Sequence, residues 1–462
     1  MKKALITTFL SLLIACTGIA QQITGDWNGL LKIGGQIQLH IALKIEKTDT
    51  GYQVNFASPD QGATNIPVNE FTYNAPAVSF KSKAIGASYS GEYTSDSITG
   101  TFIQGGHSMP LTFHRGIVEG PKRPQEPKLP LPYYSEDVSF ENTAAKIQLA
   151  GTLTMPQKEG SYPAVILITG SGAQNRDEEL LGHKPFLIIS DYLTRQGIAV
   201  LRYDDRGFGK SGGSFKTATS LDFASDVESA IAYLKTRKEI KQIGLIGHSE
   251  GGLIAPIVAA KNKDVAFIVM LAGTGIRGDK LLLLQTELIS RVEGTPDSTI
   301  AKVNAFNKGA FDIIVNNEDD TIIKKDLSAY FNKYAVEHPA EVPTGTTTAA
   351  YVAAQVKEVM NPWPWLKFLL TYDPVSSLKK VQCPVLALNG EKDLQVPPKE
   401  NLGSIRNALK GNKHVTIKEY PGLNHLFQEC KKCSPSEYAG IEQTISPVVL
   451  EDISKWIKTT IK

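Results

Sequence analysis

The sequence predicts an α/β protein in which a doubly wound, mostly parallel sheet follows a small antiparallel β domain. Beyond the first third of the chain, short apolar runs typical of buried strands alternate with longer segments of helical periodicity. The first quarter instead alternates apolar and polar residues in short segments separated by Gly, Asn and Asp, which is typical of antiparallel strands. With 462 residues, 42% of them hydrophobic, the chain is long enough for more than one domain.

The first 20 residues are predicted to be a signal peptide. Two lysines precede an apolar run, residues 4–15, which is too short to span a bilayer, and small residues up to Ala20 offer a cleavage site. We therefore expect an exported protein, periplasmic or secreted, without an integral membrane span. As an alternative, Cys16 at the end of the apolar run could carry a lipid anchor.

Residues 21–118 are predicted to form the antiparallel β domain, a small sandwich or barrel. The clearest strand is 36–47, which places Ile37, Leu39, Ile41, Leu43 and Ile45 on one face. Shorter strands are expected at 52–56, 77–80, 87–93 and 97–102. A linker, 119–133, should follow, because its five closely spaced prolines favour an extended polyproline segment.

Residues 134–462 are predicted to form the second domain, which opens with a hairpin at 138–155. Buried strands are expected at 163–168, 198–203, 242–247, 266–271 and 384–389, a further strand at 415–420, and helices at 185–196, 221–236 and 448–461. An insertion at about 277–372, with helix-like runs at 281–292 and 349–360, should cap the sheet. Its aromatic residues, Trp363, Trp365 and Phe368, either line a pocket or pack the cap against the core.

The most informative segment is 242–255, where an apolar strand runs into GHSEG at 247–251 and then into a helical pattern. A serine hydroxyl is a weak nucleophile, so the fold must hold it on a tight turn at the strand tip, where a base can reach it. The two glycines of the motif leave room for that turn. Ser249 is therefore the candidate nucleophile, and His248 is expected to face away from it.

The last two predicted strands are followed by Asp393 and His425, respectively. A serine nucleophile of this kind needs an acid and then a histidine, each in a loop after a late strand. We therefore predict Asp393 as the acid and His425 as the base. Asp373 and Glu391 are competing acids, but Asp373 precedes its strand, and Glu391 follows so early that its side chain should point elsewhere.

Acyl transfer also needs hydrogen-bond donors for the oxyanion that develops on the attacked carbonyl. The amide of Glu250, directly after the serine, is the first candidate. The second is the amide of Ser171, in the run 163–172, where an apolar strand ends in small residues that let the backbone approach a ligand. The alternative for this run is an ordinary glycine turn.

From about Tyr134 to the C-terminus the chain resembles the α/β-hydrolase superfamily, specifically its serine esterases. The matching motifs are ILITGSG at 166–172, DDRGFGKS at 204–211, GHSEG at 247–251, NGEKD at 389–393 and GLNHLF at 422–427. One departure is Thr169, where many relatives have a histidine before the oxyanion glycine. More weakly, GDWNG at 25–29 resembles lipocalin-like modules that precede such exported hydrolases.

These observations predict an exported serine carboxylesterase that acts on small-molecule esters through an acyl-enzyme on Ser249, with neither a cofactor nor a metal. A serine peptidase or amidase of the same fold is one alternative. A carbohydrate- or lipid-binding protein with an inactive hydrolase domain is another. Charge is nearly balanced, with 49 Lys and Arg against 47 Asp and Glu, so nothing indicates a nucleic-acid partner.

Two further motifs resemble binding sites for a cofactor or a metal ion. Residues 207–212 spell G-x-G-x-x-G, but no helix is expected to open there, so we predict no dinucleotide site and interpret the neighbouring Asp204 and Arg206 as structural. Cys430 and Cys433 form a C-x-x-C pair without a second pair, which supports zinc poorly and leaves a disulfide or two free thiols. Cys383 is expected to pack as a small apolar residue.

Overall fold

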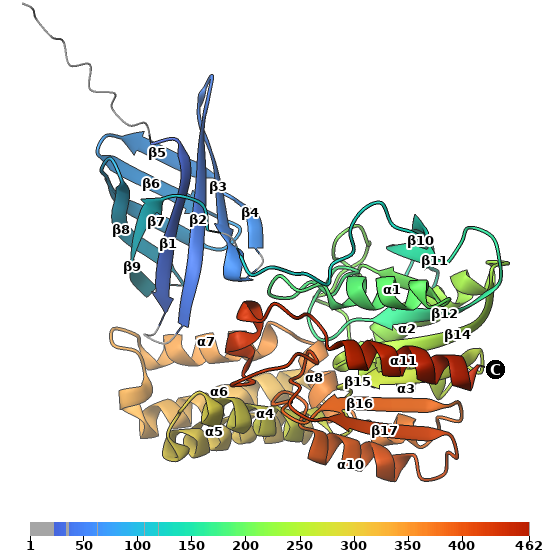
Figure 1. Ribbon diagram of the computed structural model, residues 1–462. Helices are drawn as coiled ribbons and strands as arrows, with labels where there is room; N and C mark the ends of the chain where they lie inside the picture. The colour runs from blue at the N-terminus through green and yellow to red at the C-terminus, as the bar shows by residue number, and fades with distance from the viewer. Residues whose placement is uncertain (1–22, 34–36, 62, 106, 119, 462) are drawn as a thin grey trace, which may run out of the picture. The chain divides into compact units, whose positions relative to one another are not determined.

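The computed structural model describes residues 23–33, 37–61, 63–105, 107–118 and 120–461 (Figure 1). The predicted signal peptide and Cys16 lie outside these residues. The described chain divides into two compact units, and the boundary falls between Gly120 and Pro121. Within the described ranges, no helix combines the length and the apolar character needed to cross a lipid bilayer.

The first unit is a nine-stranded antiparallel sheet in the order β4-β3-β2-β1-β9-β8-β7-β6-β5. Its strands are β1 (Gly25–Ile33), β2 (Ile37–Thr48), β3 (Gly51–Ser58), β4 (Ala63–Pro67), β5 (Glu70–Asn74), β6 (Ala77–Ser82), β7 (Ala87–Tyr93), β8 (Ser97–Gln104) and β9 (His107–Arg115). The sheet curls on itself and brings Tyr52 of β3 close to Phe71 of the edge strand β5, with 5.5 Å between the ring centroids. The alternation of apolar and polar residues in the sequence did not predict β1, β4, β5 and β9.

Aromatic side chains fill the inside of this curled sheet. Every second residue of β6 is buried, as a strand with one face toward a core requires. The tryptophan of the GDWNG segment, Trp27, is fully buried and donates its indole N–H to the carbonyl of Ile23 at 2.8 Å. The Arg115 guanidinium lies 4.3 Å from the centre of the Trp27 ring. The module is therefore held by a packed aromatic core.

The second unit is built on an eight-stranded sheet in the order β10-β11-β13-β12-β14-β15-β16-β17. Its strands are β10 (Tyr134–Asn142), β11 (Ile147–Met155), β12 (Tyr162–Ile168), β13 (Ala199–Tyr203), β14 (Ile240–His248), β15 (Val265–Leu271), β16 (Val385–Gly390) and β17 (Val415–Tyr420). The hairpin β10–β11 pairs antiparallel with the rest, and the strands from β13 to β17 run parallel. The order reverses at β12, so the sheet is doubly wound as the sequence predicts.

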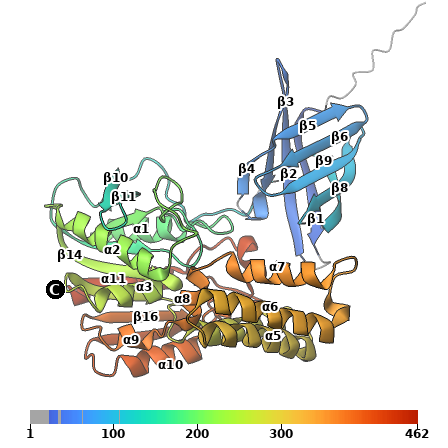
Figure 2. The same cartoon turned by 180° about the vertical axis from the view of Figure 1, so that it is seen from behind.

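Helices cover both faces of this sheet, as Figures 1 and 2 show. They are α1 (Pro185–Arg195), α2 (Ser220–Lys235), α3 (Glu250–Ala259), α9 (Val375–Leu378), α10 (Pro398–Ala408) and α11 (Pro447–Thr460). Successive residues of β12 face opposite cores, since Val165 belongs to the apolar core that contains α1 and α11, whereas Ile166 belongs to the core that contains α2, α3 and α10. Burial on both faces explains why the strand reads as a continuous apolar run.

An all-helical cap interrupts the sheet between β15 and β16. It contains α4 (Gly278–Val292), α5 (Asp297–Val315), α6 (Asp320–Glu337), α7 (Thr348–Met360) and α8 (Trp365–Thr371). The cap has an apolar core of its own, in which Ile314, Leu327 and Phe331 are fully buried. The sequence indicated α4 and α7, but not α5 and α6.

The proline-rich segment from Pro121 onward packs with the second unit. Its Arg123 guanidinium donates to the carbonyls of Gly182, Leu181, Ala439 and Ile441 at 2.6–3.1 Å. The predicted linker, 119–133, is thus attached to the hydrolase-like unit over most of its length. Prolines predict an extended backbone, but not the side chains that anchor it.

Candidate active site

Ser249 lies at the sharp turn between β14 and α3. Its backbone has φ 52° and ψ −112°, a conformation that a non-glycine residue rarely adopts. The surrounding glycines permit this turn, because a Cβ on Gly247 would lie 2.0 Å from the carbonyl oxygen of Gly251. A Cβ on Gly251 would in turn lie 2.1 Å from the carbonyl oxygen of Ile168. The strained turn places the serine at the tip of the sheet.

His425 follows β17, and its ring contacts Asp393, which follows β16. The Nδ1 of His425 lies 2.8 Å from Oδ2 of Asp393. The other carboxylate oxygen of Asp393 accepts the backbone N–H groups of Gln395 and Val396, both at 2.8 Å. These bonds fix the carboxylate, which in turn orients the imidazole. No hydrogen bond joins the Ser249 hydroxyl to the His425 ring among the described residues, and such contacts often tighten only with substrate.

The competing acids lie elsewhere. The Glu391 carboxylate is exposed and accepts the backbone N–H of Gly422 at 2.9 Å. Asp373 is exposed and accepts the backbone N–H of Val375 at 3.0 Å, at the start of α9. Only Asp393, of these three carboxylates, is paired with His425.

The two predicted oxyanion donors are unengaged. Within the described residues, neither the Ser171 amide nor the Glu250 amide donates to another group. The neighbouring Gly170 amide is taken by the Glu178 carboxylate at 2.7 Å. The Thr169 hydroxyl donates to Asp205 at 2.7 Å, so this side chain braces the loop at the position where many relatives have histidine. Ser171 and Glu250 line the same cavity as Ser249, and their role as oxyanion donors stays a prediction.

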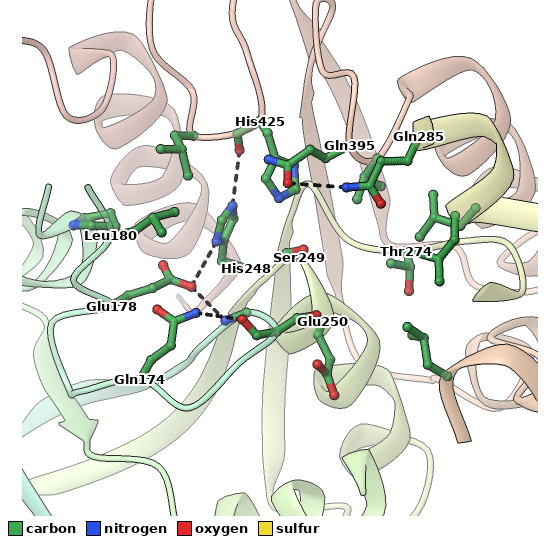
Figure 3. Close-up of a pocket in the computed structure, with 18 of the residues that line it drawn as sticks. Gln174, Glu178, Leu180, His248, Ser249, Glu250, Thr274, Gln285, Gln395 and His425 are labelled. Atoms are coloured by element: carbon green, nitrogen blue, oxygen red, sulfur yellow. Dashed lines mark hydrogen bonds and ion pairs between the residues drawn. The ribbon is translucent and has the colours of Figure 1, made fainter. Parts of the chain in front are cut away.

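A cavity of about 300 Å³ surrounds Ser249. In Figure 3, Ser249 lies beneath His425, with Glu178 and His248 to one side and Thr274 to the other. The cap closes the cavity with apolar side chains, namely Leu281, Leu282, Trp365 and Leu369. Gln285 of the cap also reaches Gln395 at 3.5 Å.

The Glu250 side chain makes contacts that the sequence did not predict. Its side chain is 2% exposed and accepts hydrogen bonds from Ser220 at 2.6 Å and from the Trp365 indole at 2.9 Å. Burial raises the pKa of the Glu250 carboxyl above its usual value, although these donors oppose the shift. Trp365 therefore lines the cavity and also attaches the cap to the core, so both interpretations of the aromatic cluster hold for it.

The sequence predicts that His248 faces away from Ser249, but this residue lines the cavity. Its Nδ1 is 3.0 Å from Oε1 of Glu178, and its Nε2 is 3.2 Å from the backbone carbonyl of His425. Glu178 carried no sequence signal, because it lies in an irregular loop far from the other residues in the chain. Only the fold brings these side chains together.

Asp204 and Arg206, just before the G-x-G-x-x-G segment, make structural contacts. Asp204 accepts the Arg176 guanidinium at 2.9 Å, and Arg206 donates to Asp226 at 2.7 and 2.8 Å. No helix begins between residues 207 and 219, so the geometry of a dinucleotide site is lacking there.

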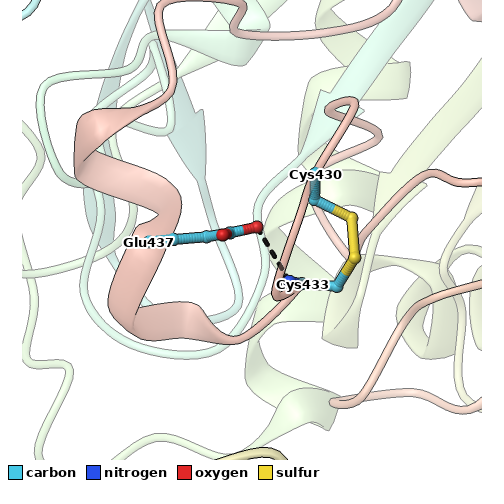
Figure 4. A group of neighbouring side chains, drawn as sticks. All are labelled: Cys430, Cys433 and Glu437. Carbon is cyan, nitrogen blue, oxygen red and sulfur yellow. Dashed lines mark hydrogen bonds between the residues drawn. A yellow bond between two sulfur atoms is a disulfide. The ribbon is translucent and has the colours of Figure 1, made fainter.

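Cys430 and Cys433 form a disulfide in the loop beyond His425, as Figure 4 shows. The Cα atoms of the two cysteines are 5.0 Å apart. Glu437 lies beside them and accepts the backbone N–H of Cys433 at 2.8 Å. Because the sulfurs are bonded to each other, these three residues do not make a metal site. Cys383 is partly buried, and burial raises its pKa to about 11.

Two family descriptions match the chain in succession. Residues 186–329 match the serine aminopeptidase S33 family, and residues 344–455 match the dienelactone hydrolase family. Esterase EstD of Thermotoga maritima is 27% identical over 377 residues, which are 79% of this chain and 80% of that protein. A bifunctional esterase/perhydrolase of Acinetobacter calcoaceticus is 24% identical over 51% of this chain and 77% of its own.

Among solved structures, a Pyrococcus furiosus esterase, Pf2001, superposes with a TM-score of 0.45 and 15% identity, over 75% of this chain and all of that one. Both matching families are hydrolase families, and the second unit has the α/β-hydrolase fold, which an antiparallel β domain precedes in the chain.

Proposed function

We propose that this protein is a serine carboxylesterase in which Ser249 forms the acyl-enzyme. The observation that carries the proposal is the arrangement around one cavity of a serine on a strained strand-to-helix turn and a histidine held by a buried carboxylate. His425 takes the proton of Ser249 as the hydroxyl attacks the ester carbonyl, and Asp393 stabilises the imidazolium that forms. The amides of Ser171 and Glu250 receive the oxyanion.

Deacylation repeats these steps with water as the nucleophile. His425 first returns its proton to the leaving alcohol and then accepts one from the attacking water. The tetrahedral intermediate again places its negative oxygen on the two amides. Collapse of that intermediate frees Ser249 and releases the carboxylic acid.

The cavity favours a neutral, compact ester over a substrate with a free amino group. An ammonium group would need an accessible carboxylate, and Glu178 and Glu250, the two carboxylates that line the cavity, are both buried. Glu178 is bound by His248 and the Gly170 amide, and Glu250 by Ser220 and Trp365. With about 300 Å³ of space and leucines on the cap side, the cavity suits a small acyl group.

Labelling with a fluorophosphonate, together with a series of chromogenic esters of increasing acyl length, tests this proposal. Wild-type protein should label once and should prefer the short acyl chains over the long ones and over aminoacyl amides. Ser249→Ala should lose the label and lower ester turnover by roughly three to six orders of magnitude while the fold stays intact. Retention of more than about a tenth of wild-type turnover by this variant would show that Ser249 is not the nucleophile.

We also propose that the protein is exported after cleavage behind Ala20. The support is the lysine pair, the apolar run of residues 4–15 and the small residues that follow. A disulfide in the second unit agrees with an oxidising compartment. N-terminal sequencing of protein from its native host should begin at Gln21, whereas a lipid-modified Cys16 would establish the anchored alternative.

A further inference from the structure

Two buried side chains, Glu178 and His248, join the loop of the oxyanion donor to the loop of the general base. Oε1 of Glu178 accepts the Gly170 amide at 2.7 Å and lies 3.0 Å from Nδ1 of His248. Nε2 of His248 lies 3.2 Å from the backbone carbonyl of His425. The chemical steps proposed above give neither side chain a role.

The contacts of His248 define its protonation state. Both of its ring nitrogens face acceptors, a carboxylate oxygen and a carbonyl oxygen, so both must carry a proton to satisfy them. Burial lowers the pKa of His248, but the Glu178 carboxylate and the His425 carbonyl outweigh it, and the pKa is raised overall. The Asp393 carboxylate acts in the same direction, and the His425 ring lies 4.8 Å away. The two acceptors and the raised pKa both favour the imidazolium form of His248, paired with the Glu178 carboxylate.

We propose that the Glu178–His248 ion pair is a positioning device that holds the oxyanion loop and the His425 loop at a fixed spacing around Ser249. On one side, Glu178 fixes the Gly170 amide and thereby the direction of the next peptide group, whose N–H is the Ser171 donor. On the other side, His248 fixes the carbonyl of His425. This inference rests on the roles proposed for Ser171, Ser249 and His425.

A buried ion pair that only stabilised the fold would behave differently from a positioning pair. Loss of such a pair would lower the free energy of unfolding, but the protein that remains folded would keep its turnover and its pH profile. A positioning pair acts on the transition state, so its loss lowers kcat and the affinity for a tetrahedral analogue together. Its dependence on the charge of His248 also adds an alkaline limb to the pH profile.

The experiment compares Glu178→Gln and His248→Gln with wild type. Glutamine at 178 can still accept the Gly170 amide but carries no charge, and glutamine at 248 can donate to only one of the two acceptors. We expect kcat/KM on a short ester to fall by roughly 10- to 100-fold in each variant, mainly through kcat, with affinity for a trifluoromethyl ketone falling by a similar factor.

The pH profile supplies the readout that a purely structural role would not change. In wild type, kcat/KM should fall on the alkaline side as His248 loses its proton. Glu178→Gln should move this fall to lower pH, because the carboxylate that keeps the imidazole charged is gone. His248→Gln should abolish the alkaline limb.

Asp60→Asn serves as a matched control, since Asp60 pairs with His40 at 2.9 Å in the first unit, and its loss should leave all three measurements unchanged. Should either active-site variant fail to fold, NMR of histidine-labelled wild-type protein remains available. One imidazole should stay doubly protonated at about pH 8.

Folded variants with wild-type kcat/KM and an unchanged alkaline limb would overturn the proposal, as would a neutral ring for every histidine at that pH. Those outcomes leave the esterase proposal standing. Failure of the wild type to hydrolyse any ester, or full activity in Ser249→Ala, would instead overturn the proposed function.

Discussion

The indole N–H of Trp365, on cap helix α8, donates to the carboxylate of Glu250, with 2.9 Å to one oxygen and 3.0 Å to the other. Glu250 follows the candidate nucleophile directly, at the first position of α3. The contact thus connects the cap to the turn that carries Ser249. A negative charge at the start of a helix is favourable, but here it is removed from water and depends on its donors.

Trp365→Phe removes one donor from this buried carboxylate while keeping most of the aromatic packing. We expect the free energy of unfolding at neutral pH to fall by about 1–3 kcal/mol, measured by urea denaturation. Trp363→Phe is the matched control, because the Trp363 indole donates at 2.9 Å to Asp320, whose side chain is exposed. Water can replace that donor, so the loss should stay below about 1 kcal/mol. Equal losses in the two variants would contradict the importance of the Glu250 contact.

Asp393→Asn should lower kcat/KM by roughly three to four orders of magnitude, since the imidazole loses the carboxylate that orients it and stabilises its charged form. The controls are the competing acids, Glu391→Gln and Asp373→Asn, whose side chains accept backbone N–H groups away from His425. Each should cost less than about tenfold in the same steady-state assay. Either control matching Asp393→Asn would show that the acid is assigned incorrectly.

Because of Asp205, the free energy of unfolding should fall as pH rises through the neutral range. Burial raises the pKa of Asp205 to about 8, against a value near 4 in the unfolded chain. Between those values the folded state holds a proton that the unfolded state has released, so the free energy of unfolding falls with increasing pH, by at most about 1.4 kcal/mol per unit. Asp205→Asn should flatten this decline in urea denaturation measured at several pH values.

The neighbouring Asp204 provides a control of opposite sign. Burial opposes the ionisation of Asp204, but hydrogen bonds from Arg176 and from the Lys210 amide hold its pKa below the usual range. Its contribution to stability is therefore present above the unfolded pKa and is lost as pH falls through the folded one. Asp204→Asn should lower stability at neutral pH, where Asp205→Asn raises it relative to wild type. A change of stability in the same direction in both variants would contradict the opposite pKa shifts of Asp204 and Asp205.

Thiol counting checks the cysteine assignment. In denatured protein that begins at Gln21, one thiol should react before reduction and three after it, because only Cys383 is free among the described residues. In the native protein Cys383 should react slowly, since burial raises its pKa to about 11 and disfavours the thiolate. Three reactive thiols in the denatured, unreduced protein would contradict the disulfide.

The hydrolase fold was readable in the sequence because its signals are local. A strand buried on both faces, such as β12, is a continuous apolar run, and the turn at Ser249 demands small residues at fixed spacing. The chain order of serine, acid and histidine then predicted Ser249, Asp393 and His425. The structure pairs Asp393 with His425 and places His425 and Ser249 in the lining of one cavity. Strands β4 and β5 could not be predicted, because short edge strands have too few residues to show the alternation of apolar and polar side chains.

The sequence by itself determined the class of fold, the candidate nucleophile and the residues expected to assist it, since strand tips and turns constrain their own residues. The tertiary structure alone decided which distant side chains surround those groups. Glu178 meets His248, and Trp365 meets Glu250, across separations that no local pattern encodes. The physical reason is that a buried charge selects its partner by proximity in the folded core, where desolvation makes an unpaired carboxylate costly.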